Sequence, residues 1–190
     1  MGHCRLARLS DAPAIQAIYA PIVRDTAISF EYEVPGVEEI GRRLRKVLAS
    51  KPWLVHEEDG QVVGYAYAST FRERTAYDWS TEVSIYIDSS THGRGIGRQL
   101  YTTLFEVLRA LGYQQAIAGA TMPNEASERL HRSMGFKQIA HFPAIGYKFG
   151  RWHDTVFWSL PLRSLPDVAP DIININDLVK TAEWAWLTNE

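Results

Sequence analysis

The chain has 190 residues, of which 46% are hydrophobic and 22% are charged, and its formal net charge is −2. This length and composition are typical of one globular domain with a full hydrophobic core. Because basic residues are not in surplus, we expect neither a nucleic acid nor an anionic membrane surface as a partner. Cys4 is the only cysteine, which excludes intrachain disulfides and cysteine-based zinc sites and favours a cytoplasmic location. No apolar run approaches the length of a membrane span.

The first part of the chain has the periodicity of a short strand followed by two helices. The strand is predicted over residues 5–8. Ser10 is the expected N-cap of the first helix, and Pro13 falls in its first turn, where a missing N–H is tolerated. Apolar residues at helical spacing then follow in two runs, which are Ile15, Ile18, Tyr19 and Ile22, and then Val37, Ile40, Leu44, Val47 and Leu48.

Strands dominate the middle of the chain. Asp59-Gly60 is a strong signal for a hairpin turn between strands over 53–57 and 62–70. A further strand over 81–88 leads into a long amphipathic helix that starts near Ile96 and stops at Gly112.

The remaining elements are a strand over 115–120, a helix that Asn124 caps and Gly135 closes, and two last strands over 136–142 and 147–160. This order predicts a mixed α/β layer structure. Residues 1–162 form the expected domain. The proline-punctuated residues 163–190 form a tail with one possible short helix, built from Leu178, Val179, Ala182 and Trp186. We expect this tail to pack on its own domain; contact with a second subunit is the alternative.

The most informative stretch runs from Glu82 to Gly97. An alternating strand ends there, and a glycine-rich loop opens the long helix. The loop supplies backbone N–H groups and the helix supplies the positive end of its dipole, so together they form a phosphate-binding site. Glu82 begins the strand that leads into this loop, which places a potential base within one strand length of the phosphate-binding site. The pattern indicates chemistry on a cofactor that carries phosphate.

The loop His92-Gly93-Arg94-Gly95-Ile96-Gly97 resembles the pyrophosphate loop of the GNAT acyltransferases, although His92 departs from the usual Gln or Arg. Further matches resemble the subfamily of phosphinothricin, methionine sulfoximine and methionine sulfone N-acetyltransferases. They are Ala76-Tyr77-Asp78-Trp79, Glu82, Ile85-Tyr86-Ile87, Pro123-Asn124, Leu130-His131 with Gly135-Phe136, and Gly150-Arg151-Trp152-His153-Asp154. The resemblance runs from about Arg5 to Leu162.

This resemblance implies the GNAT fold, which has a mostly antiparallel central sheet, helices on both faces and a splayed central strand. It also implies acetyl-CoA as the cosubstrate. The splayed strand would hold the pantetheine arm through backbone groups of Ile85, Tyr86 and Ile87. The pyrophosphate would lie on the loop from His92 through Gly93, Arg94, Gly95, Ile96 and Gly97 to Arg98, where both arginines have the alternative of being solvated. Asn124 would contact the CoA arm while it caps its helix.

Acetyl transfer to an amine needs a base for the ammonium proton and a proton carrier for the departing thiolate. A strand glutamate alone is usually solvated, but beside the loop Glu82 is the expected base, acting directly or through water. His131 occupies the position where many GNAT members carry a tyrosine acid. It could protonate the thiolate or help to deprotonate the amine, and the sequence does not separate these roles.

Phe30, Arg72, Arg74 and Tyr77 are the expected substrate-binding residues. Arg72 and Arg74 are expected to alternate along the end of a strand and so to share one face. A guanidinium fork suits a carboxylate, although two surface arginines beside Glu73 are an equally good interpretation of the pattern alone. The resemblance favours Arg74 as the carboxylate ligand.

The expected function is transfer of acetyl from acetyl-CoA to the α-amine of a small amino acid in a ternary complex. The alternatives are a GNAT enzyme for another amine, such as a polyamine, a peptide N-terminus or an aminoglycoside, and a non-catalytic acetyl-CoA-binding module. The resemblance implies a homodimer with the last strands near the interface. No metal site is expected, His3, His56 and His141 are assigned no role, and His153 and Asp154 should point to opposite faces of their strand.

Overall fold

The computed structural model describes residues 2–188 and contains one seven-stranded sheet. Its strands lie side by side in the order β1 (His3–Leu6), β2 (Trp53–Glu58), β3 (Gln61–Thr70), β4 (Ser80–Ile87), β5 (Gln115–Thr121), β7 (Arg151–Pro161) and β6 (Lys137–Lys148). Neighbouring strands are antiparallel except for β4 and β5, which are parallel. The predicted mixed, mostly antiparallel sheet is therefore confirmed.

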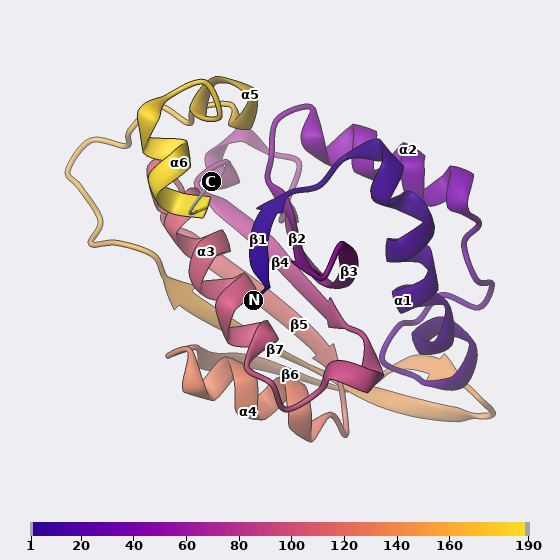
Figure 1. Cartoon of the computed structure of the whole chain (residues 1–190). Helices are drawn as coiled ribbons and strands as arrows, with labels where there is room; N and C mark the ends of the chain where they lie inside the picture. The colour runs from indigo at the N-terminus through magenta and orange to yellow at the C-terminus, as the bar shows by residue number, and fades with distance from the viewer. Residues whose placement is uncertain (1, 189–190) are drawn as a thin grey trace.

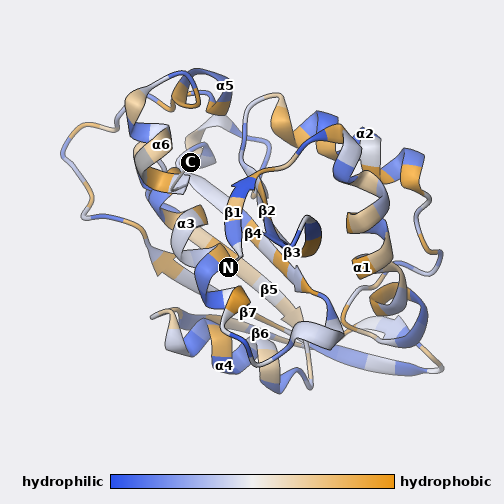
Figure 2. Cartoon of the chain, viewed as in Figure 1, coloured by the Kyte–Doolittle hydropathy of each residue, from blue (hydrophilic) through white to orange (hydrophobic). Residues whose placement is uncertain are grey.

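Helices cover both faces of this sheet, as predicted (Figure 1). One face carries α1 (Ala12–Asp25) and α2 (Val37–Leu48), and the other carries α3 (Ile96–Ala110) and α4 (Glu125–Ser133). Each layer has its own core. The apolar stripe of α3 packs with the central strands, while α1 and α2 pack over β2 and β3. Figure 2 shows the mixed hydropathy of α2, whose buried residues Ile40 and Leu44 face the sheet.

The central strand is splayed. β4 pairs with β5 only from Ser80 to Glu82, opposite Gln115–Ile117, although β4 continues to Ile87 and β5 continues to Thr121. Its pairing with β3 on the other side is complete from Thr81 to Ile87. The sheet therefore opens between β4 and β5 just after Glu82, which confirms the expected split.

Two expectations at the N-terminal end were wrong. The first strand occupies His3–Leu6, and Ser10 lies in a short 3-10 turn, η1 (Leu9–Asp11). The N-cap of α1 is therefore Asp11, and the helix begins at Ala12, one residue later than expected. The reason is Asp11, whose carboxylate accepts from the backbone N of Arg8 at 2.7 Å and binds the buried Arg5 guanidinium at 2.8 Å. That carboxylate closes a turn before the helix can start.

The last two strands also differ from the prediction. The Asp59-Gly60 turn is confirmed, with φ angles of 49° and 77°, but the break expected near residues 143–146 is a bulge inside β6. The strand absorbs Pro143 through a register shift between Phe142 and Gly146. The true turn comes at Phe149 and Gly150, both with positive φ.

The tail contains two short helices in place of the single one expected, α5 (Ile175–Leu178) and α6 (Ala182–Thr188). Ile175, Leu178 and Trp184 are buried in the same core as α3. Figure 1 shows α6 beside α3, at the edge of the sheet where β1 lies. The side chain of Trp186 and residues 189–190 lie outside the described residues. Within residues 2–188, every helix is too short or too polar to cross a bilayer.

Candidate active site

A cavity of about 630 Å³ lies at the opening of the sheet, between α1, the loop before α3, and α4. It gathers most of the residues that the sequence assigned to the cofactor. These are Ile85, Tyr86, Ile87, His92, Gly93, Gly95, Ile96, Gly97 and Asn124, together with the expected catalytic residue His131. Elements far apart in sequence thus meet where β4 separates from β5.

The backbone of β4 offers unpaired groups to this cavity. The N–H of Asp88 bonds to the carbonyl of Val63 on β3, whereas the carbonyl of Trp79 accepts from Gln115 on the β5 side. Backbone groups of successive strand residues point to opposite sides. Ile85 and Ile87 therefore direct their N–H and C=O groups into the gap. Tyr86, one of the three residues expected to use its backbone, directs its groups toward β3 instead and lines the cavity with its side chain.

The loop before α3 has the geometry of a phosphate cradle. Gly93 and Gly95 have φ angles of 81° and 82°, in the left-handed region that favours glycine, and Gly95 is the N-cap of α3. A Cβ on Gly97 would lie 3.3 Å from the Leu130 side chain, so the close packing of α3 and α4 favours a small residue there. His92 Nε2 lies 3.2 Å from the Ile87 carbonyl, which links the loop to the splayed strand.

Arg94 and Arg98 are exposed and lie outside the residues that line this cavity. Arg94 forms an ion pair with Glu58 at 2.9 Å, and Arg98 donates to the Ser133 carbonyl at 3.4 Å. Their side chains are directed to the protein itself, so contact with a pyrophosphate stays a prediction for both residues.

His131 is buried on α4 within a polar chain. Its Nε2 lies 3.2 Å from the Tyr101 hydroxyl, its Nδ1 lies 3.2 Å from the Ser127 hydroxyl, and its ring stacks on Trp158 with centroids 5.0 Å apart. Burial lowers the pKa of His131 to about 4, so the imidazole is neutral at pH 7. Asn124 begins the same helix and accepts from the Ser127 N–H at 3.1 Å, which confirms its role as the N-cap.

A second cavity of about 450 Å³ lies between α2 and strands β2 and β3. Its floor is a stack of aromatic rings, with Trp53 and Tyr67 4.2 Å apart and nearly parallel. Its rim combines residues of both charges, which are Glu31, Arg43, Lys46, Lys51, Arg72 and Glu73. Tyr86 lines this cavity as well as the first, so the two cavities meet at the middle of β4.

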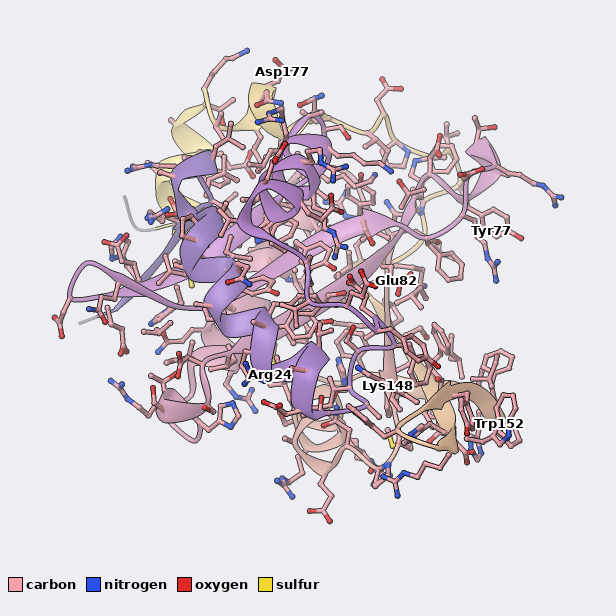
Figure 3. All side chains as sticks on the ribbon, turned by 90° about the vertical axis from the view of Figure 1, so that its right-hand side faces the viewer. Arg24, Tyr77, Glu82, Lys148, Trp152 and Asp177 are labelled. Atoms are coloured by element: carbon pink, nitrogen blue, oxygen red, sulfur yellow. The ribbon has the colours of Figure 1, made fainter. Side chains whose placement is uncertain are left out.

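Glu82 lies on β4 near this meeting point. It is partly buried and stands directly opposite Ser69, which lines the second cavity. Burial raises the pKa of Glu82, and the positive charge of Arg72 offsets part of that increase. In Figure 3, Glu82 lies between the loop that carries Tyr77 and the hairpin that carries Lys148 and Trp152.

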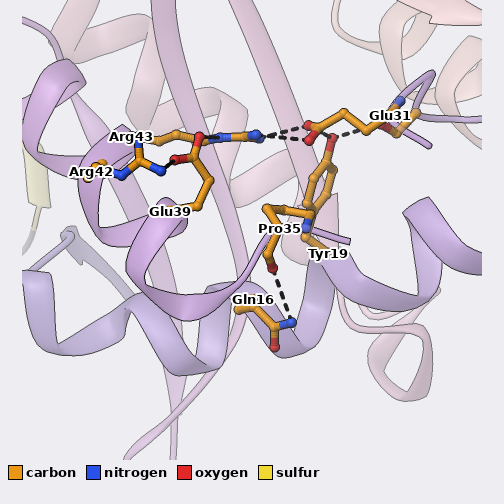
Figure 4. A network of polar contacts seen from close by, with 8 residues as sticks. Gln16, Tyr19, Glu31, Pro35, Glu39, Arg42 and Arg43 are labelled. Carbon is orange, nitrogen blue, oxygen red and sulfur yellow. Dashed lines mark hydrogen bonds and ion pairs between the residues drawn. The ribbon is translucent and has the colours of Figure 1, made fainter. Parts of the chain in front are cut away.

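A polar network that the sequence did not reveal borders the second cavity (Figure 4). Tyr19 donates to Glu31 at 2.7 Å, and Arg43 binds both Glu31 oxygens at 2.7 and 2.8 Å and Glu39 at 2.7 Å. The bond from Arg43 lowers the pKa of Glu31, while burial raises the pKa of Tyr19 to about 12. These partners come from different segments of the chain, so their spacing in the sequence does not predict that they are in contact.

The expected substrate-binding residues are only partly brought together. Arg72 lines the second cavity, whereas Arg74 and Tyr77 lie in exposed positions on the following loop and its 3-10 turn, η2 (Thr75–Tyr77). The expectation that Arg72 and Arg74 alternate on a strand was wrong, because β3 ends at Thr70. Phe30 packs against the β6–β7 hairpin, with its ring 6.2 Å from that of His153.

His153 and Asp154 do not pair with each other, as predicted. His153 is buried and its Nε2 lies 3.0 Å from the Lys148 carbonyl. Asp154 binds His141, a residue to which the sequence assigned no role, at 2.8 Å on the surface of the hairpin. Among residues 2–188, no three His, Cys, Asp or Glu side chains are arranged to hold a metal ion.

Comparison with known proteins agrees with this geometry. A model of the acetyltransferase (GNAT) domain family matches residues 4–157. Phosphinothricin N-acetyltransferase of Alcaligenes faecalis is 42% identical over 169 residues, which are 88% of this chain and 86% of that protein. L-methionine sulfoximine/L-methionine sulfone acetyltransferase of Salmonella typhimurium is 36% identical over 168 residues, covering 88% of this chain and 97% of that protein.

The fold has solved counterparts. The structure of a GNAT-superfamily phosphinothricin acetyltransferase from Sinorhizobium meliloti in complex with acetyl-CoA superposes with a TM-score of 0.83 at 35% identity. The superposition covers 90% of this chain and 97% of that one. Family match, relatives and superposition confirm the expected fold and class of enzyme, and we conclude that the chain belongs to the GNAT acetyltransferase family.

Proposed function

We propose that this acetyl-CoA-dependent N-acetyltransferase acetylates the α-amine of a small amino acid, such as phosphinothricin, methionine sulfoximine or methionine sulfone. The observation that carries the proposal is the position of β4 between two cavities. The backbone groups of Ile85 and the N–H of Ile87 face the first, Tyr86 lines both, and Glu82 lies on the same strand. The names of the relatives supply the candidate acceptors.

The first cavity suits acetyl-CoA. The N–H groups of the Gly93–Gly97 loop and the N-terminus of α3 would hold the pyrophosphate, and Ile85 and Ile87 would bind the pantetheine amides through their backbones. Acetyl-CoA supplies an activated acyl group and a thiolate leaving group. A backbone N–H of the splayed strand would donate to the acyl oxygen as negative charge develops there.

Glu82 would accept one proton of the acceptor ammonium, directly or through water. The second proton, which the nitrogen loses as the amide forms, would pass to the departing thiolate, so that CoA leaves as the thiol. Its carboxylate is a stronger base than an ordinary glutamate because burial raises its pKa. Since Glu82 and the second cavity lie on the same side of β4, an amine held in that cavity would approach the strand at its splayed point.

His131 would act as a neutral hydrogen-bond donor at the thiolate end of the first cavity. An imidazolium acid does not fit a pKa of about 4, because almost no His131 is protonated at pH 7. The same low pKa makes the ring a poor base for an ammonium group. Its contacts with the Tyr101 and Ser127 hydroxyls would orient the ring, and because each hydroxyl can donate or accept, they suit either neutral tautomer.

Arg74 and Arg72 would bind the acceptor carboxylate, with Arg72 on the rim of the second cavity and Arg74 two residues further along the same loop. Phe30 and Tyr77 would complete the acceptor site from the hairpin side and from η2. An anionic acceptor suits these guanidinium groups better than a polyamine does.

The test is acetyl-CoA-dependent thiol release with phosphinothricin, methionine sulfoximine, methionine sulfone and spermidine. We expect turnover with at least one of the three amino acids and none with spermidine. Turnover with spermidine and with none of the amino acids would refute the proposed acceptor class.

A homodimer is the proposed assembly, in a cytoplasmic location that the single cysteine favours. β6 is a long strand at the edge of the sheet, and large apolar side chains on and beside it are exposed. Ile139, Ile145 and Trp152 are 54%, 56% and 64% exposed, respectively. Exposed apolar edge strands are sites of association.

Light scattering should give the mass of two chains at micromolar concentration and of one chain for Ile145→Glu. A wild-type monomer throughout the concentration range would exclude this assembly.

A further inference from the structure

The tail, residues 163–188, lies beyond the family match that ends at residue 157. It is anchored by buried apolar residues, because Ile175 and Leu178 are 0% and 2% exposed within the main core. Such anchoring fixes the polar residues beside them, Asn174 and Asn176, against the body of the protein. The tail therefore has defined contacts with the domain.

One set of contacts closes the end of α2. Asn176 donates through its side-chain amide to the Leu48 carbonyl at 3.0 Å, and Asn174 donates to the Ala49 carbonyl at 3.0 Å. The backbone N–H of Ile175 donates to the Ser50 carbonyl at 3.3 Å. The last carbonyls of a helix have no donors within the helix, so the tail supplies partners that α2 cannot supply itself.

A second set of contacts holds the segment that leads into β4. The indole N–H of Trp79 donates to the Pro170 carbonyl at 2.7 Å. The tail also follows the end of α3, where the Ile173 N–H donates to the Leu111 carbonyl at 2.9 Å. A Cβ on Gly112 would lie 2.6 Å from the Asp171 carbonyl oxygen, so the tail approaches this turn closely.

Each of these two segments forms part of the wall of the second cavity. Ser50 and Lys51 line it immediately after the end of α2. Arg72 and Glu73 line it from the loop that continues to Trp79. By contrast, the first cavity is built from α1, β4, the loop before α3, the first turns of α3, β5 and α4. The bond from Ile173 reaches α3 at its opposite end, at Leu111. The tail thus bridges two parts of the wall of the cavity that we assign to the acceptor.

We propose that the tail is a positioning element for the acceptor: it holds residues 48–51 and 71–79 at a fixed separation and leaves acetyl-CoA binding unaffected. This inference rests on the proposed function, because it takes the second cavity as the acceptor site. Asn176 and Trp79 are positioning residues, since each acts on the cavity through the wall that it holds.

The kinetic test uses the full chain with two variants. Asn176→Ala removes the side-chain bonds of Asn176 to the Leu48 and Ala49 carbonyls, and Trp79→Phe removes the bond to Pro170 together with the five-membered ring of the indole. Loss of one or two hydrogen bonds should raise the acceptor KM about threefold to tenfold. The acetyl-CoA KM should stay within about twofold of wild type. Lys180→Ala is the matched control, because Lys180 is exposed and pairs with Asp177 inside the tail. Equal changes in both KM values, or no change in either, would overturn the proposal.

Hydrogen exchange supplies a second test that needs no acceptor. In Asn176→Ala, the amides of residues 48–51 and of Trp53 should exchange about threefold to tenfold faster than in wild type, while amides of residues 83–97 keep their rates. Unchanged exchange at 48–51 and Trp53, or a uniform increase throughout the chain, would overturn the proposal even if the enzyme turned over none of the amino acids offered. Failure of the proposed function would appear separately, as wild-type inactivity toward those amino acids.

Discussion

The two cavities that meet at Tyr86 are built in opposite ways. The first takes its chemistry from backbone groups, because the splayed half of β4 and the Gly93–Gly97 loop direct unpaired N–H groups into it. The second takes its chemistry from side chains, with a floor of stacked rings and a charged rim drawn from separate segments. Backbone groups suit a cosubstrate that never changes, whereas side chains can be exchanged to fit a different acceptor.

The sharpest test of this division is Glu82, the group that we assign to the reaction between the two cavities. Glu82→Gln removes the base while keeping the shape of the side chain, so kcat should fall about 10²- to 10³-fold at pH 7. Wild-type activity should fall as the pH drops through the Glu82 pKa, which burial raises, because the protonated carboxyl cannot accept a proton. A Glu82→Gln enzyme with the full rate and an unchanged pH profile would exclude this role.

The pH dependence of the free energy of unfolding tests whether His131 is a buried neutral group in the first cavity. Its folded pKa of about 4 is depressed by burial, so the unfolded chain binds a proton that the folded chain does not as the pH falls below 6.5. Protonation therefore favours unfolding, by about 2 kcal/mol between pH 7 and pH 5. His131→Gln should remove that part of the loss. The measurement is denaturant unfolding at both pH values, and parallel losses in the two proteins would show that His131 is not a buried neutral group.

The same division explains what could be predicted from the sequence. The phosphate loop and the Asn124 cap were recognisable because neighbouring residues determine them, through glycine at positive φ and a side chain that bonds its own helix. The contact of Arg43 with Glu31 was not recognisable, since it depends on how α2 packs against a distant loop. Likewise, Arg72 and Arg74 were expected on a strand because nothing in their alternation marks the end of β3 at Thr70.

A substitution of Gly95 tests the first cavity, which is built from backbone groups. Gly95→Ala places a Cβ on a residue with a φ of 82°, which should cost about 1–2 kcal/mol in the cradle conformation. The acetyl-CoA KM should therefore rise about tenfold while the acceptor KM changes little. Gly41→Ala is the control, because Gly41 lies within α2 and an added Cβ there would meet no atom within 4 Å. A larger effect on the acceptor KM than on the acetyl-CoA KM would contradict the assignment of the cradle.

Substitutions of Arg74 and Arg72 test the second cavity, which is built from side chains. We expect them to have the smallest effects on the kinetic constants. Both residues are exposed, so solvent screens their charge and each ion pair with a carboxylate contributes about 1 kcal/mol or less. Arg74→Ala and Arg72→Ala should each raise the acceptor KM about threefold to fivefold and leave the acetyl-CoA KM unchanged. Arg45→Ala, on an exposed position of α2, is the matched control. If the amide of methionine sulfone, which lacks only the carboxylate, lost as much kcat/KM as methionine sulfone in the Arg74 variant, Arg74 would not be the carboxylate ligand. Such a result would assign the carboxylate to another residue on the rim of the second cavity. It would not affect the assignment of the first cavity, which depends on backbone groups of β4 and of the loop before α3.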